Sequence, residues 1–504
     1  MRWRHPYETH PLVARPGLVA ALGGCAIGPD YQRPDLAVPA EFKEAEGWRR
    51  AEPRDVFQRG AWWELYGDQT LNDLQMHLER SNQTLAQSVA QFRQAEALVR
   101  GARAAFFPSI TGNVGKTRSG QGGGDSTVLL PGGSTVSSGG SGAISTSYSS
   151  NLSVSWEVDL WGKLRRQLEA NQASLHASAA DLAAVRLSQQ SQLAQNYLQL
   201  RVMDEQIRLL NDTVTAYERS LKVAENKYRA GIVTRADVAQ ARTQLKSTQA
   251  QAIDLKYQRA QLEHAIAVLV GLPPAQFNLP PVASVPKLPD LPAVVPSQLL
   301  ERRPDIASAE RKVISANAQI GVAKAAYFPD LTLSAAGGYR SGSLSNWIST
   351  PNRFWSIGPQ FAMTLFDGGL IGSQVDQAEA TYDQTVATYR QTVLDGFREV
   401  EDYLVQLSVL DEESGVQREA LESAREALRL AENQYKAGTV DYTDVVTNQA
   451  TALSNERTVL TLLGSRLTAS VQLIAAMGGG WDSADIERTD ERLGRVEEGL
   501  PPSP

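Results

Sequence analysis

The sequence has almost none of the residues that form covalent cross-links or soft-metal sites. Cys25 is the only cysteine among 504 residues, which excludes an internal disulfide and a cysteine-built metal cluster. None of the five histidines stands at a metal-ligand spacing from another, and the five methionines are scattered along the chain. We therefore predict no metal centre, and nothing in the sequence indicates another cofactor.

A basic excess and a long apolar run are missing as well. The net charge is −7 with 21% charged residues, so nucleic acid is not an expected partner. No run of about 18 apolar residues follows the N-terminus, so we expect no transmembrane helix, and membrane insertion would require a β-barrel. The glycines of Gly120–Ser126 precede no P-loop lysine, and Arg303 with Asp305 suits a structural role at a helix start. We predict that the protein is not an enzyme.

The lone cysteine lies in a context typical of a bacterial lipoprotein signal. Small residues, Gly23 and Gly24, precede Cys25 and follow a short apolar run and an arginine-bearing start. This pattern predicts a signal peptide over residues 1–24 and acylation of Cys25 once it becomes the N-terminus. The alternative is a buried free cysteine.

The chain contains an internal repeat. Residues Ala224–Val238 and Ala431–Val445 are identical at nine of fifteen positions and share the motif AENxYxAG. Upstream, KAAYFPDL (Lys324–Leu331) repeats RAAFFPSI (Arg103–Ile110). Three landmark glycines recur 207 residues later: Gly162, Gly231 and Gly271 correspond to Gly369, Gly438 and Gly478. The sequence thus predicts two copies of one structural unit.

The repeat predicts the division of the chain into domains. A lipidated N-terminal segment (25–60) precedes repeat one (61–271), a proline-rich linker (272–304) and repeat two (305–480), and a polar tail (481–504) is expected to be disordered. Each repeat is predicted to hold a helix, a β-hairpin and a long α-hairpin. The β-hairpins are placed at about 108–160 and 329–367, and the α-hairpins at 163–271 and 370–478.

Each β-hairpin is predicted to follow directly after a helix. Proline cannot donate to a helix ladder, so Pro108 ends a helix predicted over Leu71–Ala105, and Pro329 ends its counterpart over Ile306–Ala326. Beyond each proline the apolar period changes to two, as in the alternation from Leu152 to Leu160. The helix–strand junctions are accordingly placed at Pro108, Gly162, Pro329 and Gly369.

Four strands are too few to close a barrel, and an open sheet edge in lipid leaves backbone groups unsatisfied. If the hairpins are embedded, several subunits must pool their strands. The stretch Tyr148–Leu160 is long enough to cross a membrane. The Gly/Ser tract from Gly120 to Ser141 is expected to be a flexible exposed loop. A soluble β-sandwich is the alternative, but it leaves the long helices without a role.

The longest elements are predicted to be paired helices. Residues Lys163–Ala230 contain neither glycine nor proline, which predicts a helix of about 100 Å, and a heptad spacing from Leu193 to Tyr228 predicts a coiled coil. The second copy has two internal glycines and is expected to be more pliable. Gly231 and Gly438 end these helices at left-handed turns. Thr234 and Asp441 are predicted to cap the returning helices, each with an acid three residues later that completes a capping box.

Four motifs in this order carry a family resemblance. They are GPDYQRP (Gly28–Pro34), WWELYGDQTLNDL (Trp62–Leu74), LLERRPDIASAE (Leu299–Glu310) and the doubled AENxYxAG. Together, from Cys25 to about Trp481, the chain resembles the outer-membrane efflux proteins of the TolC and OprM type, in particular their NodT-like lipoprotein branch.

The resemblance implies a mixed, mainly α-helical fold in a homotrimer. Each subunit would give four strands to one twelve-stranded outer-membrane β-barrel, continuous with a helical barrel that crosses the periplasm. A mixed α/β equatorial domain would be built from the termini and the linker. The implied function is a passive exit duct for drugs, small toxic molecules or ions, which docks to a periplasmic adaptor and an inner-membrane pump of the RND type. The protein would be lipid-anchored in outer-membrane lipids.

The resemblance also implies a gate at the α-hairpin tips. Asp444 falls where the family places a pore-constricting acid, Tyr435 matches a latch tyrosine, and Thr447 stands where some members carry a second acid. Three equivalent carboxylates near one axis would attract cations and repel one another. Asp237 and Asp441 are expected to add charge nearby. The alternative is that Asp237 and Asp444 only cap helices.

Two other functions are compatible with the pattern. The same architecture serves as the exit duct of type I protein secretion, although a lipid on Cys25 favours efflux. A coiled-coil scaffold that transports nothing is the second, and the alternating strands of both β-hairpins argue against it.

Overall fold

In the computed structural model, structure is described for 26–45, 61–120, 125–129, 135–139, 144–282, 284–289, 296–484 and 486. Cys25 and the predicted signal peptide lie outside these residues. Two compact units are present. The first comprises Met1–Gln32, Glu96–Ala173 and Ile314–Asp383, and the second comprises Arg33–Ala95, Ser174–Val313 and Gln384–Pro504. Each unit therefore draws on both predicted repeats.

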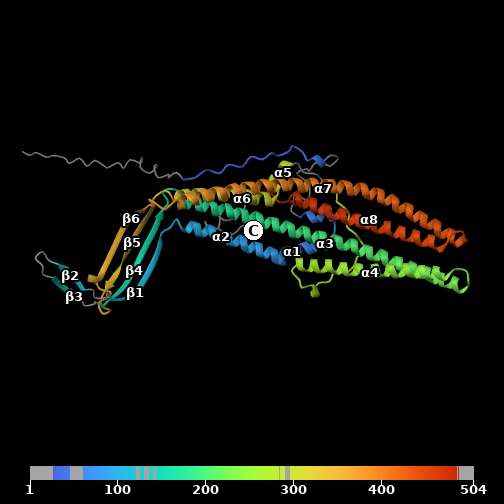
Figure 1. Ribbon diagram of the computed structural model, residues 1–504, viewed down its shortest axis with the longest axis horizontal. Helices are drawn as coiled ribbons and strands as arrows, with labels where there is room; N and C mark the ends of the chain where they lie inside the picture. Colours follow the sequence, from blue (N-terminus) through green and yellow to red (C-terminus); the bar gives the residue numbers. More distant parts are fainter. Residues whose placement is uncertain are drawn as a thin grey trace, which may run out of the picture. The chain divides into compact units, whose positions relative to one another are not determined.

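The first unit is built on a four-stranded antiparallel sheet with the order β1-β4-β5-β6 (Figure 1). Its strands are β1 (Ser109–Gly120), β4 (Ile144–Val158), β5 (Asp330–Ser341) and β6 (Arg353–Ala362). The central pair joins the two halves of the sequence, with Val154 opposite Ala335. Strand positions follow the predicted alternation, and apolar side chains such as Ile110 and Ile357 stay exposed. The sheet thus has two open edges and an uncovered apolar surface among the described residues.

Part of the tract expected to be a flexible loop is instead a β-ribbon. Strands β2 (Asp125–Leu129) and β3 (Thr135–Gly139) pair antiparallel over five positions. Both contain β-branched residues that favour extended backbone, which outweighs the glycine and serine content around them. The expectation of a flexible exposed loop over this tract did not include these two strands.

The helix–strand junctions lie where the prolines and glycines predict them. Helices α2 (Gln83–Ala104) and α6 (Pro304–Ala325) end just before Pro108 and Pro329. Gly162 and Gly369 have left-handed backbones, with φ of 81° and 95°, directly before the next helices begin. The carboxylate of Asp367 accepts hydrogen bonds from the backbone N–H groups of Gly369 and Ile371 and so supports the second junction.

The first predicted helix is two helices. Helix α1 (Gln69–Ser81) and α2 are separated at Asn82, whose backbone is extended. The Asn82 side chain accepts from the Leu85 N–H at 2.9 Å and donates to the Leu269 carbonyl at 2.8 Å. The first bond caps the start of α2, and the second satisfies a carbonyl at the end of α4. The expectation of one continuous helix over Leu71–Ala105 was therefore wrong.

Two long α-hairpins dominate the second unit (Figure 1). Helix α3 (Lys163–Arg229) returns as α4 (Arg235–Leu269), and α7 (Leu370–Ala437) returns as α8 (Tyr442–Ala476). The paired lengths agree closely, at 67 and 68 residues for the outgoing helices and 35 for both returning helices. Several heptad positions of both hairpins are buried, among them Leu193, Leu200, Leu407 and Leu421, whereas Tyr228 at the end of the first series is 46% exposed.

Helix α8 is the most apolar of the long helices, although it contains no uninterrupted run of about 18 apolar residues. Among the described residues it is the single helix long and apolar enough, by those two criteria, to cross a membrane. Half of its most apolar window is buried against the rest of the chain, and Leu467, Leu473 and Ile474 are fully buried. Polar residues, among them Arg466 and Gln472, interrupt the apolar run, but the window still has a mean hydropathy of 1.4.

The smaller elements are short helices. Helix α5 (Pro296–Arg302) ends the linker, and 3₁₀ turns occupy Lys43–Ala45, Trp62–Tyr66, Pro274–Gln276 and Thr350–Asn352. After α5, the buried Arg303 binds Asp305, Glu399 and the Ala476 carbonyl, with its closest contact 2.7 Å from Asp305. These contacts agree with the structural role expected for Arg303 and Asp305.

The linker is held on the first α-hairpin by a buried polar network. Asp204 of α3 accepts from Arg201 at 3.1 Å, from Arg259 of α4 at 2.6 Å and from the Val282 N–H at 3.2 Å. Both arginines also donate to linker carbonyls, and Glu263 accepts the Leu279 N–H at 2.7 Å. The network extends to the N-terminal region, because Arg201 donates to the Tyr197 hydroxyl, which donates to Asp68.

Candidate pore site at the hairpin tips

Both α-hairpins turn with the same backbone motif. At the end of α3, Gly231 N–H donates to the Tyr228 carbonyl at 2.9 Å and Ile232 N–H donates to the Lys227 carbonyl at 2.9 Å. The same pair of bonds recurs at the end of α7, where Gly438 N–H donates to the Tyr435 carbonyl at 3.1 Å and Thr439 N–H donates to the Gln434 carbonyl at 3.0 Å. The two glycines have φ of 70° and 73°, and nothing lies within 4 Å of where a Cβ would stand. The left-handed backbone, rather than lack of space, is what favours glycine at both turns.

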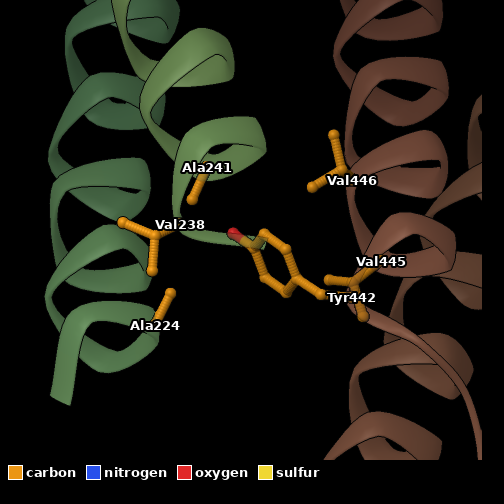
Figure 2. Close-up of a cluster of buried hydrophobic side chains, with 6 residues drawn as sticks. All are labelled: Ala224, Val238, Ala241, Tyr442, Val445 and Val446. Atoms are coloured by element: carbon orange, nitrogen blue, oxygen red, sulfur yellow. The ribbon is translucent and has the colours of Figure 1, made fainter. Parts of the chain in front are cut away.

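The two tips pack against each other through an apolar cluster (Figure 2). From the first hairpin, Ala224 of α3 and Val238 and Ala241 of α4 contribute; from the second, Tyr442, Val445 and Val446 of α8. Figure 2 shows the Tyr442 ring extending from α8 toward the first hairpin. The acids of both tips are thereby carried on one packed body within the second unit.

Asp237 is committed to a helix cap. Its carboxylate accepts from the Thr234 N–H at 2.8 Å and from the Thr234 hydroxyl at 2.9 Å, while its own N–H donates to the same hydroxyl oxygen at 3.3 Å. This is the predicted capping box at the start of α4. The geometry favours the structural interpretation of Asp237.

The expected capping box at the second tip is absent. Asp441 occupies the N-cap position of α8 without a side-chain capping bond, and the Asp444 N–H donates to the Asp441 backbone carbonyl at 3.2 Å instead. A reciprocal box would bring two carboxylates together, whereas the first tip pairs a carboxylate with a hydroxyl. Both acids at the second tip are exposed, and the capping role expected for Asp444 was therefore wrong.

Tyr435 and Thr447 differ in their surroundings. The Tyr435 ring lies 5.4 Å from that of Tyr442, and the Lys227 ammonium stands 4.1 Å from the Tyr435 ring centroid. This cation–π contact joins α3 to α7. Thr447 is exposed, and its hydroxyl donates to the Thr443 carbonyl of its own helix at 2.9 Å.

Tyr442 is the buried aromatic residue between the tips. The pKa of Tyr442 is raised to about 12, chiefly by burial and also by Tyr435, Tyr217 and Asp237, against a hydrogen bond with Ser220 that lowers it. The hydroxyl therefore stays neutral at physiological pH. Neither this ring nor the Lys227 contact follows from the sequence motif, because both depend on which faces of the two hairpins meet.

The structure thus brings together the predicted residues of both tips, namely Gly231, Gly438, Asp237, Asp441, Asp444, Tyr435 and Thr447, within the second unit. The junction residues Pro108, Pro329, Gly162 and Gly369 belong to the first unit.

Comparisons with known proteins give a consistent result. The profile of the outer membrane efflux protein family matches residues 74–272 and 295–479. The cation efflux system protein CusC of Escherichia coli is 29% identical over 466 residues, covering 92% of this chain and 97% of CusC. The pyoverdine export outer membrane protein OpmQ of Pseudomonas aeruginosa is 32% identical over 470 residues, covering 92% and 95%. Among solved structures, the outer-membrane channel OprN superposes with a TM-score of 0.82 at 28% identity, covering 91% of this chain and all of OprN.

Proposed function

This chain belongs to the outer membrane efflux protein family and is an outer-membrane channel of an efflux system, and we propose that it is the passive exit duct of a tripartite pump. Three copies of the chain form one conduit in this proposal. The conduit docks to a periplasmic adaptor and, through it, to an inner-membrane pump of the RND type, which supplies the energy.

The observation that carries the proposal is the incomplete sheet. Strands β1 and β6 have no outer partner among the described residues, and Ile110, Val114 and Ile357 are 69%, 78% and 76% exposed. Open edges and uncovered apolar side chains are costly in lipid and prone to aggregate in water. Pooling the strands of sister copies into a closed ring pairs the edges and turns the apolar face toward lipid.

We propose that the inner-membrane pump determines which molecules are exported. CusC is named for cations and OpmQ for pyoverdine, although both are similar to this chain over nearly their whole length. A duct that serves such unlike molecules in its relatives needs no cargo-specific pocket. We include drugs, small toxic molecules and ions in the proposed range.

The gate is proposed to lie at the second tip, with Asp444 and Asp441 as its charged groups. Both carboxylates are exposed and free of capping bonds, so their charge faces solvent. Asp237 adds to the negative electrostatic potential at the tips, although its carboxylate is bound in the cap of α4. Tyr435 stabilises the second tip by packing against the Tyr442 ring. Thr447 adds a polar group without charge. A ring of such carboxylates around an axis would prefer cations.

Planar-bilayer recordings of the purified protein test this proposal. We expect discrete conductance steps with a preference for cations, and Asp444→Ala is expected to reduce the cation-to-anion permeability ratio by about twofold or more, because charge at a constriction is lost. Asp254→Ala removes an exposed acid from the middle of α4 and is the matched control. Unchanged ion selectivity in Asp444→Ala would refute the role of this residue in the gate. The absence of any current in the wild-type protein would refute the proposal that the protein is a duct.

A lipid on Cys25 is proposed as the anchor. The residues that follow Cys25 are fixed to the first unit: Ile27 N–H donates to the Trp161 carbonyl at 3.1 Å, and Arg166 donates to the Ile27 carbonyl at 3.2 Å. A lipid attached to Cys25, two residues before Ile27, would therefore be tethered near the helix–strand junction. Labelled palmitate is expected to enter the wild-type protein and not Cys25→Ser, and equal labelling of both would refute the assignment.

A further inference from the structure

A cavity of about 310 Å³ lies beside the apolar cluster of the tips. Val223 and Ala224 of α3 and Tyr442 and Val445 of α8 form part of its wall. Its size is at the lower end of the range for small-molecule sites in proteins. The charged groups of the proposed gate lie outside this space, because Asp441 and Asp444 are not among its lining residues, although Tyr435 is.

Two of the residues that line this cavity each carry a buried polar atom without a hydrogen-bond partner among the described residues. These atoms are the amide oxygen of Gln449, a residue only 8% exposed, and the hydroxyl of Tyr435. Buried polar groups are nearly always paired in folded proteins, by protein, water or ligand. Gln449 requires a donor, and Tyr435 offers a donor or an acceptor. A hydroxyl group placed between them would satisfy both.

The rim of the cavity is positively charged. Lys227, Lys436 and Arg219 line it together with one acid, Glu432. These four side chains carry three positive formal charges and one negative formal charge. Lys227 is already positioned by its contact with the Tyr435 ring, which places its ammonium close to the cavity. An anionic group is the charge complement of this rim.

We propose that the cavity is a binding site for a small aromatic carboxylate that carries a hydroxyl group. The ring occupies the apolar wall of Val223, Ala224 and Val445. The hydroxyl donates to the Gln449 amide oxygen and accepts from the Tyr435 hydroxyl. The carboxylate lies against Lys227 and Lys436. Because the site is lined by both hairpins, an occupant contacts both tips at once.

Calorimetric titration of the full-length protein in detergent with 6-hydroxy-2-naphthoate tests the proposal. We expect saturable binding of one molecule per chain. Gln449→Leu and Lys436→Gln are each expected to weaken binding by about fivefold to tenfold, because each removes one polar partner. The analogue 2-naphthoate, which lacks the hydroxyl, is expected to bind the wild-type protein more weakly and to distinguish poorly between wild type and Gln449→Leu.

A second pair of variants tests the proposal at exposed positions, where a substitution is not expected to prevent folding. Val223 is 51% exposed, so Val223→Trp fills the cavity mouth without overpacking a core and is expected to abolish binding. Val416→Trp places the same ring at a position of α7 that is 64% exposed, away from the lining residues, and is expected to bind as wild type. No saturable heat, or equal affinity in Val223→Trp and Val416→Trp, would mean that water alone occupies the cavity and would overturn the proposal. Binding is measured here without transport, so this failure leaves the efflux-channel assignment standing.

Discussion

Replacing Asp204 with alanine is expected to destabilise the protein by about 3–5 kcal/mol, the cost typical of breaking a buried ion pair from one side. The Asp204 side chain is 2% exposed, and its carboxylate accepts from Arg201, Arg259 and the Val282 N–H. In the variant, Arg259 keeps its ion pair with Glu263, whereas Arg201 reaches a carboxylate only indirectly, through the Tyr197 hydroxyl that donates to Asp68. The variant also leaves a linker N–H without its acceptor.

The effect is measured by thermal unfolding with far-ultraviolet circular dichroism, together with proteolysis of the linker. The linker should become sensitive to protease first, since the network holds it through Leu279, Pro280 and Val282. Asp212→Ala is the matched control, because Asp212 also pairs with an arginine of α3, at 2.9 Å, but is 65% exposed. An exposed pair contributes about 1 kcal/mol or less. Similar losses in the two variants would show that the buried network does not stabilise the linker.

Elements defined by local pattern were predictable from the sequence. The absence of glycine and proline over 68 residues predicted the helix that became α3 to within one residue of its end. The turn at Gly231 followed from the residue type, because the left-handed backbone that ends the helix has a low cost only for glycine. The strand positions followed from alternation in the same way. In each case the information lies within a few neighbouring residues.

The errors occur where a distant partner decides the outcome. Asn82 is tolerated inside helices, and the break there depends on the carbonyl of Leu269, which lies 187 residues away. The linker network is equally hidden, since Asp204 and Val282 are 78 residues apart. A local pattern contains no information about which carbonyl or N–H group will be near. The prediction of a second capping box was wrong for a different reason. The sequence pattern accepts an acid at both positions of the box, but it takes no account of the repulsion between the Asp441 and Asp444 carboxylates.

The location of the candidate pore site was predictable from the sequence, but its geometry was not. The repeated turn motif located both tips, and the family resemblance selected Asp444. The contrast between Asp237, which is bound in a cap, and Asp444, which is not, required the structure. So did the cavity beside them, because Val223 and Lys227 of α3 line it together with Gln449 and Tyr435 of the second hairpin only when the two hairpins pack. Sequence therefore indicated which segments form the site, and tertiary packing determined which of their side chains remain available.

The second large effect is expected at Gly478, where alanine should destabilise the end of α8 by about 3 kcal/mol or more through combined backbone strain and overpacking. Gly478 has φ of 96°, and a Cβ there would lie 2.1 Å from the Arg302 carbonyl oxygen at the end of α5. Gly271 repeats this arrangement at the end of α4, with φ of 75° and a Cβ position 2.2 Å from the Ser81 carbonyl oxygen. In both cases backbone occupies the space, so no side-chain rotation can relieve the clash.

The hairpin tips provide the matched comparison. Gly438→Ala and Gly231→Ala carry the same backbone strain, with φ of 73° and 70°, but meet nothing within 4 Å. They are expected to cost about 1–2 kcal/mol each, the strain of a left-handed backbone alone. Thermal unfolding of the four alanine variants should therefore separate them into two pairs, with Gly478→Ala and Gly271→Ala melting at lower temperature. Four similar melting temperatures would show that α5 and α1 can move away from the returning helices at little cost, and that the close approach at these glycines does not fix the ends of α8 and α4.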